Sequence, residues 1–337
     1  MGLVYKYNRL HLSMILGIEC TAHTFGIGIV NNGKILANVK DMYKPEKGGI
    51  IPMDSANHHK EVAETVYQEA LEEAEISEKD IDVIAISNAP GLAPCLLSGM
   101  HFAKEKARKL KIRIIPVNHC IAHLEIGQSL GAENPVLLYA SGANTQIIAY
   151  SSGKYRVFGE TLDSGIGNFI DTFARYCGIP FPGGPEIEKL ALNGKYIELP
   201  YSIKGMDVSF SGMQTKMKQL YDKGEKLKDI SYSMQEIAFA MLIEAAERAL
   251  AHTGKKELVL GGGVACNARL QDMANIMCKE RGAKYFCPDR SLLVDNGAMI
   301  AFTGEIMAKR DKKLLIHPDK LDISPRERTD DVKVSWK

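Results

Sequence analysis

Two histidines spaced four residues apart are the clearest chemical signal in the sequence. His119 and His123 lie in the segment HCIAH, directly after the apolar run IIPVN. Residues four apart stand on the same face of an α-helix, so the two imidazoles can bind one metal ion together. Such an ion usually needs one or two further protein ligands. An isolated pair with this spacing also occurs as a surface or capping pair, and the remaining ligands must decide between the two interpretations.

The elements around this pair occur twice in the sequence, which indicates a third ligand. The repeat pairs residues 15–30 with 135–150, 55–74 with 233–251, 82–91 with 257–267, 112–118 with 283–289, and 118–127 with the segment DNGAMIAFTGEIM. Gene duplication explains this order by two similar α/β lobes, whereas the alternative is the plain alternation of any α/β protein. The duplication gives Asp295 the place in the second lobe that the histidines have in the first, and so makes it a candidate ligand.

The duplicated plan resembles the actin, sugar-kinase and chaperone ATPase superfamily, in which two α/β lobes clamp a nucleotide. Glycine-rich turns approach the nucleotide in that fold, because a missing Cβ lets backbone N–H groups come close to phosphate or purine. The corresponding turns here are CTAHT, SGANT and Gly261–Gly263. We therefore expect an α/β fold of two duplicated lobes with an interlobe metal and nucleotide cleft.

Composition limits the class of protein further. The chain has 337 residues, of which 45% are hydrophobic, and its 42 basic and 41 acidic residues leave a net charge of +1. A global basic field is therefore absent, and any nucleic-acid contact must come from a local patch or a partner. The sequence has no run of roughly 18 apolar residues, so no membrane contact is expected. Its seven scattered cysteines include no C-x-x-C pair, which favours a cytoplasmic chain with reduced thiols.

The repeat also predicts the domain boundaries. Residues 14–134 are expected to form the first lobe and residues 135–309 the second, with an insertion around 160–230. Residues 1–13 precede the first apolar run and are expected to be an N-terminal extension. Residues 310–337 are charged, contain two prolines and lack apolar periodicity, which predicts a tail or linker.

Several motifs resemble one family closely. HCIAH, YASGANTQ, DVSFSGMQT, GGGVACNARL and DNGAMIA are similar to the family that makes threonylcarbamoyladenosine in transfer RNA, and the match runs from about residue 14 to 309. The family formerly had the name O-sialoglycoprotein endopeptidase, and its archaeal and eukaryotic members are the catalytic subunit of the KEOPS complex. The RTDDVKVSW ending favours the archaeal type. Zinc proteases of the H-E-x-x-H type need a glutamate where this chain has Cys120, so proteolysis is disfavoured.

The resemblance implies two sets of site residues. A divalent metal ion, iron or zinc, would be bound by His119, His123, Tyr139 and Asp295. An adenine nucleotide or threonylcarbamoyl-adenylate would be contacted by the following residues: Tyr139, Ala140, Ser141, Gly142, Ala143, Asp171, Gly184, Glu188 and Asn267. The turn departs from the family's S-G-G-N-T, because Ala143 adds a methyl group where backbone must approach phosphate. A second departure is NAPGLAP in place of G-P-G-L-G-P.

The implied reaction transfers the threonylcarbamoyl group from threonylcarbamoyl-adenylate to the exocyclic amine of the adenosine beside the anticodon in ANN-decoding tRNA. The metal would hold the acyl-adenylate and polarise its carbonyl. His23 in CTAHT is a candidate general base, and a turn histidine without chemistry is the alternative.

A second function from another class is an ATP-binding regulatory or scaffold subunit that transfers nothing. A pure nucleotide clamp has no need of histidine ligands, so His119 and His123 discriminate the two functions. The expected partners are tRNA, an atypical protein-kinase subunit that is separate or fused C-terminally, and other small KEOPS subunits. The basic helix face at residues 104–113 is a solvated face by default and a tRNA contact as the alternative.

Overall fold

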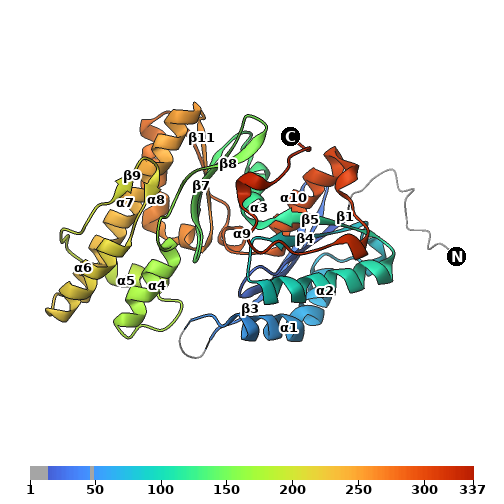
Figure 1. Ribbon diagram of the computed structural model, residues 1–337, viewed down its shortest axis with the longest axis horizontal. Helices are drawn as coiled ribbons and strands as arrows, with labels where there is room; N and C mark the ends of the chain where they lie inside the picture. Colours follow the sequence, from blue (N-terminus) through green and yellow to red (C-terminus); the bar gives the residue numbers. More distant parts are fainter. Residues whose placement is uncertain (1–13, 46–48) are drawn as a thin grey trace. The chain divides into compact units, whose positions relative to one another are not determined.

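The computed structural model describes residues 14–45 and 49–337, which fall into two compact units (Figure 1). Unit 1 contains the described residues up to Ser129 together with Gly153–Tyr155 and Asp295–Lys337, and unit 2 contains Leu130–Ser152 and Arg156–Val294. The N-terminal extension expected at residues 1–13 lies outside the described residues. The interlobe cleft stays a prediction.

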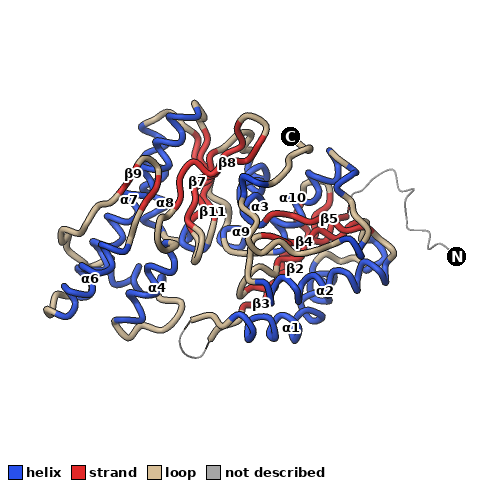
Figure 2. Tube along the Cα trace, viewed as in Figure 1, coloured by secondary structure: helices blue, strands red, loops and turns tan. Residues whose placement is uncertain are grey.

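Unit 1 is built on a five-stranded sheet in the order β3-β2-β1-β4-β5. The strands are β1 (Met14–Glu19), β2 (Thr24–Asn31), β3 (Lys34–Met42), β4 (Val83–Ala89) and β5 (Arg113–Asn118). The first three strands pair antiparallel, and β4 and β5 continue the sheet in parallel with β1. Figure 2 shows this sheet in red between two layers of helices. The apolar runs of these strands therefore form the core of the unit.

Four helices cover the two faces of this sheet. They are α1 (Pro52–Glu73), α2 (Ala93–Leu110), α3 (His119–Glu125) and α10 (Gly297–Arg310). Helices α1 and α2 pack together on one face, and α3 and α10 lie next to each other on the other face (Figure 1). The predicted helix at 55–74 is thus present and begins slightly earlier.

Helix α10 packs on unit 1, although the sequence predicted it as the end of the second lobe. A Cβ built on Gly17 would meet the carbonyl oxygen of Gly297 at 2.3 Å, and one on Gly28 would meet the Ala298 nitrogen at 2.1 Å. Only glycine lets the helix backbone lie this close to β1 and β2. This close packing places Asp295, just before α10, in the same unit as the histidine helix.

Unit 2 repeats the topology of unit 1. Its sheet has the order β12-β11-β6-β7-β8, in which an antiparallel hairpin again precedes two parallel strands. These strands are β6 (Val136–Ala140), β7 (Thr145–Ser151), β8 (Lys154–Glu160), β11 (Glu257–Gly261) and β12 (Lys284–Phe286). Helices α7 (Leu227–Thr253) and α8 (Ala268–Glu280) correspond in chain order to α1 and α2. The shared strand order confirms the predicted duplication.

The predicted insertion around residues 160–230 consists of short elements in unit 2. They are α4 (Ile166–Tyr176), α5 (Gly184–Ala191), β9 (Ile203–Lys204), β10 (Asp207–Val208) and α6 (Ser211–Asp222). Asp163 joins the beginning of this insertion to the start of α6, because its carboxylate accepts hydrogen bonds from the backbone N–H groups of Ser164, Phe210 and Ser211. Burial alone would raise the pKa of Asp163, but these bonds and the Ser209 hydroxyl lower it well below its usual value.

The segment expected as a tail or linker packs along unit 1. Ile316 forms an antiparallel bridge with Ile114 at the edge of β5. Leu321 is only 2% exposed and joins the core of unit 1, while Trp336 is 4% exposed. These anchors are single apolar residues at irregular intervals, so the sequence shows no periodicity.

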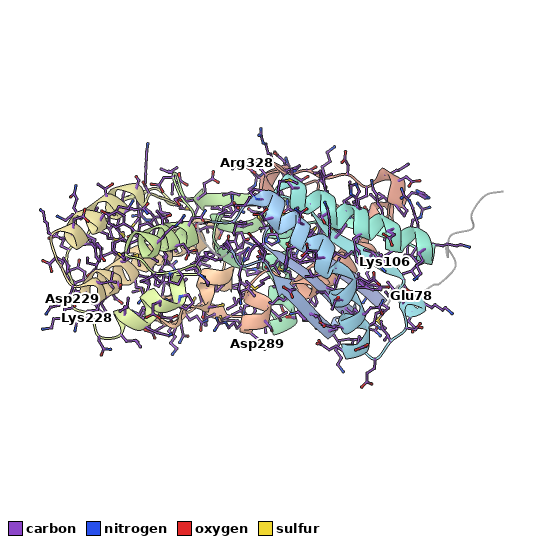
Figure 3. All side chains as sticks on the ribbon, turned by 90° about the horizontal axis from the view of Figure 1, so that it is seen from below. Glu78, Lys106, Lys228, Asp229, Asp289 and Arg328 are labelled. Atoms are coloured by element: carbon purple, nitrogen blue, oxygen red, sulfur yellow. The ribbon has the colours of Figure 1, made fainter. Side chains whose placement is uncertain are left out.

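Half of the six basic residues at 104–113, where a basic helix face was expected, form ion pairs. Lys106 is buried and its ammonium lies 2.7 Å from a carboxylate oxygen of Glu64, and Lys109 pairs with Glu78 at 3.0 Å. Figure 3 labels Lys106 and Glu78, one residue of each pair. Arg108 pairs with Asp319 at 2.5 Å. This face therefore offers fewer available cations to nucleic acid than its sequence indicates. Among the described helices, none has the length and hydropathy needed to cross a bilayer.

Candidate active site

Helix α3 begins where β5 ends, and this junction positions both histidines. The side-chain oxygen of Asn118 accepts hydrogen bonds from the backbone N–H groups of Cys120 at 3.1 Å and Ile121 at 3.2 Å, so Asn118 caps the helix. All seven residues of α3 are buried. His119 is the first residue of the helix and His123 follows one turn later, as the spacing predicted.

A buried carboxylate orients the first histidine. Glu19 ends β1 and is fully buried, and its Oε2 lies 2.8 Å from Nδ1 of His119. Its other oxygen accepts hydrogen bonds from the backbone N–H of Thr21 at 2.8 Å and from the Thr21 hydroxyl at 2.6 Å. A carboxylate that holds Nδ1–H of a histidine leaves the lone pair of Nε2 for a metal ion, as in many metal sites.

The Nε2 atoms of both histidines face the same oxygen of Asp295. Each Nε2 lies 3.4 Å from Asp295 Oδ1, and the three ligand atoms of His119, His123 and Asp295 all lie within 4.8 Å of one another. Ligand atoms bound at about 2.1 Å in tetrahedral geometry are separated by roughly 3.4 Å. The two nitrogen–oxygen separations match this value, which makes the three side chains a candidate ligand set for one divalent metal ion.

Electrostatics favour the protonation states of Asp295 and His123 that a metal ion requires. Burial would raise the pKa of Asp295, but the two imidazoles, His119 foremost, lower it well below the usual carboxyl value. Burial also lowers the pKa of His123, and Asp295 only partly opposes this. The carboxylate is therefore charged and the His123 imidazole neutral near pH 7, as a metal-ligand set needs to be.

The sequence alone did not identify Glu19 as a site residue. It indicated His23, four residues further along the chain, as a candidate general base. His23 lies in the turn between β1 and β2, is half-buried, and accepts a backbone hydrogen bond from Tyr43 at 2.8 Å through its carbonyl. Its role as a general base stays a prediction. A charged residue inside the strand-ending segment GIECT is unusual in a core, and this signal could have identified Glu19.

The SGANT turn of unit 2 is closed by its own polar atoms. The backbone N–H and the hydroxyl of Ser141 both donate to the Asn144 carbonyl at 2.9 Å. The carbonyls of Ser141 and Gly142 accept from Gly167 and Asn168 in the first turn of α4. Gly142 and Ala143 remain exposed. Tyr139 is buried at the end of β6, Ala140 is the last residue of that strand, and the metal-binding role of Tyr139 stays a prediction.

The triple-glycine turn approaches SGANT within unit 2. Gly262 has a positive φ of 91°, and a Cβ at this position would meet the Ala140 carbonyl oxygen at 2.4 Å. A side chain is excluded here both by the backbone conformation and by contact. Two turns that the sequence assigned to nucleotide binding are therefore adjacent.

The remaining predicted nucleotide contacts have structural partners in unit 2. Asp171 on α4 accepts a hydrogen bond from the backbone of Gly183 at 2.8 Å, next to Gly184 at the start of α5. Glu188 on α5 accepts from Ala268 at 2.8 Å. Asn267 caps α8 through Arg269 and Leu270, and its amide donates to Gln235 at 2.6 Å. Glu188 and Asn267 therefore meet at the start of α8.

Known sequences of one family match most of this chain. A profile of the family described as tRNA N6-adenosine threonylcarbamoyltransferase matches residues 34–302. The protein of that name from Thermococcus kodakarensis is 53% identical over 323 residues, which cover 95% of this chain and 99% of the relative. The probable bifunctional tRNA threonylcarbamoyladenosine biosynthesis protein from Methanosarcina mazei is 51% identical over 329 residues, covering 96% of this chain but 60% of that protein.

Solved structures support the fold. Full-length HypF in its phosphate- and nucleotide-bound form has a TM-score of 0.62 at 13% identity, over 88% of this chain and 56% of HypF. The component A of (R)-2-hydroxyglutaryl-CoA dehydratase from Acidaminococcus fermentans has a TM-score of 0.54 at 15% identity, over 87% of this chain and 98% of that protein. These matches confirm the predicted α/β fold.

Proposed function

Because the chain belongs to the tRNA N6-adenosine threonylcarbamoyltransferase family, we propose that it transfers a threonylcarbamoyl group to tRNA. The donor is threonylcarbamoyl-adenylate, and the acceptor is the exocyclic amine of the adenosine beside the anticodon in ANN-decoding tRNA. The observation that carries this proposal is the 53% identity to the Thermococcus enzyme over 99% of its length. The same observation favours the transferase over an ATP-binding regulatory or scaffold subunit.

His119, His123 and Asp295 would hold a divalent metal ion, iron or zinc, with Tyr139 as a further ligand. Their three ligand atoms, all within 4.8 Å of one another, support this assignment. A bound metal ion supplies Lewis-acid polarisation of a carbonyl. Glu19 holds the His119 ring in place through Nδ1 at 2.8 Å, so the Nε2 lone pair keeps its direction.

The nucleotide part of the donor would bind to unit 2. The exposed turn at Ser141, Gly142 and Ala143 would receive the phosphate, where preorganised backbone donors stabilise negative charge. Asp171, Gly184, Glu188 and Asn267 would contact the adenosine. The adjacency of SGANT and the Gly262 turn supports this assignment.

The transfer itself needs positioning and removal of one proton. The adenine amine attacks the carbamoyl carbonyl carbon, the bond from that carbon to the phosphate oxygen breaks, and AMP leaves with the bonding electrons. The attacking nitrogen must lose a proton, and His23 is the proposed acceptor of it. An adenine amine is a weak nucleophile, so fixed geometry contributes much of the rate.

The partners follow from the family and its relatives. The Methanosarcina relative is named as bifunctional and is matched over 60% of its length, so this chain corresponds to only part of it. We propose that an atypical protein-kinase subunit, separate or fused C-terminally, is one partner. The other small KEOPS subunits and tRNA complete the set, in the cytoplasm.

In vitro modification tests the function. Purified wild type and His119→Ala would be incubated with tRNA, threonylcarbamoyl-adenylate and partner proteins, and the modified nucleoside would be quantified. Product from wild type only is expected. Equal product from both proteins would exclude the metal role of His119, and no product from either would favour the scaffold subunit.

A further inference from the structure

The C-terminal segment of unit 1 contacts the first residue before the histidine helix. We call residues 311–337 the C-terminal strap. Glu327 of the strap accepts a hydrogen bond from the side-chain amide of Asn118 at 3.0 Å. Asn118 uses its other side-chain atom to cap α3. The strap therefore fixes the residue that sets the start of the helix.

The strap also contacts the last residue of the same helix. Glu125 ends α3 and is fully buried, and the Lys337 ammonium lies 2.8 Å from each of its carboxylate oxygens. The Tyr155 hydroxyl donates to Glu125 at 2.7 Å, and Gln128 donates to it as well. A buried carboxylate without a cation is costly, so Lys337 matters to this end of the helix.

Aromatic packing holds this end of the strap in place. The ring of Trp336, the only tryptophan of the chain, is buried and lies 6.2 Å from the ring of Tyr155 between centroids. The Lys337 ammonium lies 5.9 Å from the centroid of the same ring. The dark red strap ends beside α3 in Figure 1.

Before these two contacts along the chain, the strap follows the sheet. Ile316 and Ile114 exchange backbone hydrogen bonds of 3.1 and 2.8 Å, so the strap extends the edge of β5, the strand that leads into α3. Further along, the Ser324 N–H donates to the Asn88 carbonyl at 2.9 Å and the Gly91 N–H donates to the Pro325 carbonyl at 3.2 Å. Strand, helix start and helix end are thus attached to one segment.

We propose that the strap positions helix α3, with Glu327 and Lys337 as positioning residues for His119 and His123. A helix of seven residues has little stability of its own, so its orientation depends on what holds its ends. Glu327 and Lys337 contact Asn118 and Glu125 at the two ends of the helix. Asn118 directly precedes His119, and Glu125 follows His123 by two residues. The inference rests on the proposed metal role only for its metal-affinity test.

Metal affinity is the first test. Zn²⁺ binding to the full chain would be measured by competition with a chromophoric chelator for wild type, Glu327→Ala and Lys337→Ala. Each variant is expected to bind Zn²⁺ about 10-fold more weakly, because residues that orient metal ligands typically contribute a factor of about 10–100. Glu327→Gln keeps an acceptor oxygen for Asn118 and should restore most of the affinity. The matched control is Asp319→Ala, which removes an exposed strap contact to Arg108 on α2.

Hydrogen exchange of the metal-free chain is the second test and does not depend on the metal role. The backbone N–H groups of α3 should exchange at least 10-fold faster in Glu327→Ala and Lys337→Ala, while those of β1 keep their wild-type rates. Equal acceleration of α3 and β1 would mean general destabilisation and would overturn the proposal, as would unchanged exchange in both variants. If wild type binds no Zn²⁺ but exchange accelerates only in α3 of the two variants, the metal role is wrong and the positioning role of the strap still holds.

Discussion

The carboxylate of Glu19 holds the imidazole of His119 at 2.8 Å in the interior of unit 1. Two hydrogen bonds from Thr21 fix the other oxygen of Glu19, so the carboxylate cannot rotate away. The Nε2 atom of His119 is thereby directed at Asp295, 3.4 Å away. Glu19 thus acts on the triad without being one of its three residues.

Glu19→Ala should weaken metal binding without abolishing it. The substitution lets the His119 ring turn, and loss of such an orienting partner costs about 10–100-fold in metal affinity. Chelator competition with Zn²⁺ would measure the effect. Asp41→Ala is the matched control, because Asp41 forms a similar contact of 2.9 Å with His58 outside the triad. Equal Zn²⁺ affinity of Glu19→Ala and wild type would contradict the positioning role.

His59 should make the stability of unit 1 depend on pH. Burial, with a smaller contribution from His58, lowers its pKa to about 4, below the usual 6.5. Between pH 6.5 and 4, His59 is protonated in the unfolded chain but neutral in the native state. The free energy of unfolding therefore decreases as pH falls from about 6.5 to 4. The loss amounts to roughly 3 kcal/mol at 1.36 kcal/mol per pKa unit.

Urea unfolding between pH 4 and 7 tests this dependence. His59→Asn should lower the stability at pH 7 but flatten its decline toward pH 4. The exposed His101 on α2 provides the control, since His101→Asn should leave the decline as it is. The same slope in wild type and His59→Asn would assign the acid sensitivity to other groups.

The sequence could predict those parts of the site that depend on local periodicity or on duplication. His119 and His123 share a helix face because of their spacing alone, and Asp295 follows from the repeated order of elements. Glu19 lies 100 residues from His119 along the chain, so only the folded sheet brings them together. The packing of the strap was not predicted because Leu321 and Trp336 are isolated apolar residues. The assignment of α10 to the second lobe was wrong because the glycine contacts that hold it on unit 1 leave no periodic pattern in the sequence.

Ala143→Gly should strengthen adenine-nucleotide binding. Ala143 is exposed in the SGANT turn, so its methyl group adds bulk where a phosphate would approach the backbone. Glycine removes this bulk at a cost of about 0.5–1 kcal/mol in backbone entropy, which the folded turn can tolerate. Calorimetric titration with ATP should give a Kd a few-fold lower than in wild type. An unchanged or higher Kd would show that the methyl group does not face the nucleotide.

Gly262→Ala should impair nucleotide binding and lower the stability of unit 2. Its φ of 91° is strained for alanine, and the added Cβ would lie 2.4 Å from the Ala140 carbonyl oxygen, a distance that forces backbone to move. Strain of this kind costs about 1–3 kcal/mol before the clash is counted. Gly254→Ala separates the two effects, because Gly254 also has a positive φ of 68° but open space around its Cβ position. Thermal unfolding and ATP titration of both variants should show a modest loss of Tm for Gly254→Ala with normal ATP affinity. Gly262→Ala should lose more Tm and more ATP affinity, because the backbone it displaces is that of Ala140, at the end of β6 and directly before the SGANT turn. Equal losses in the two variants would rule out the close contact as the cause.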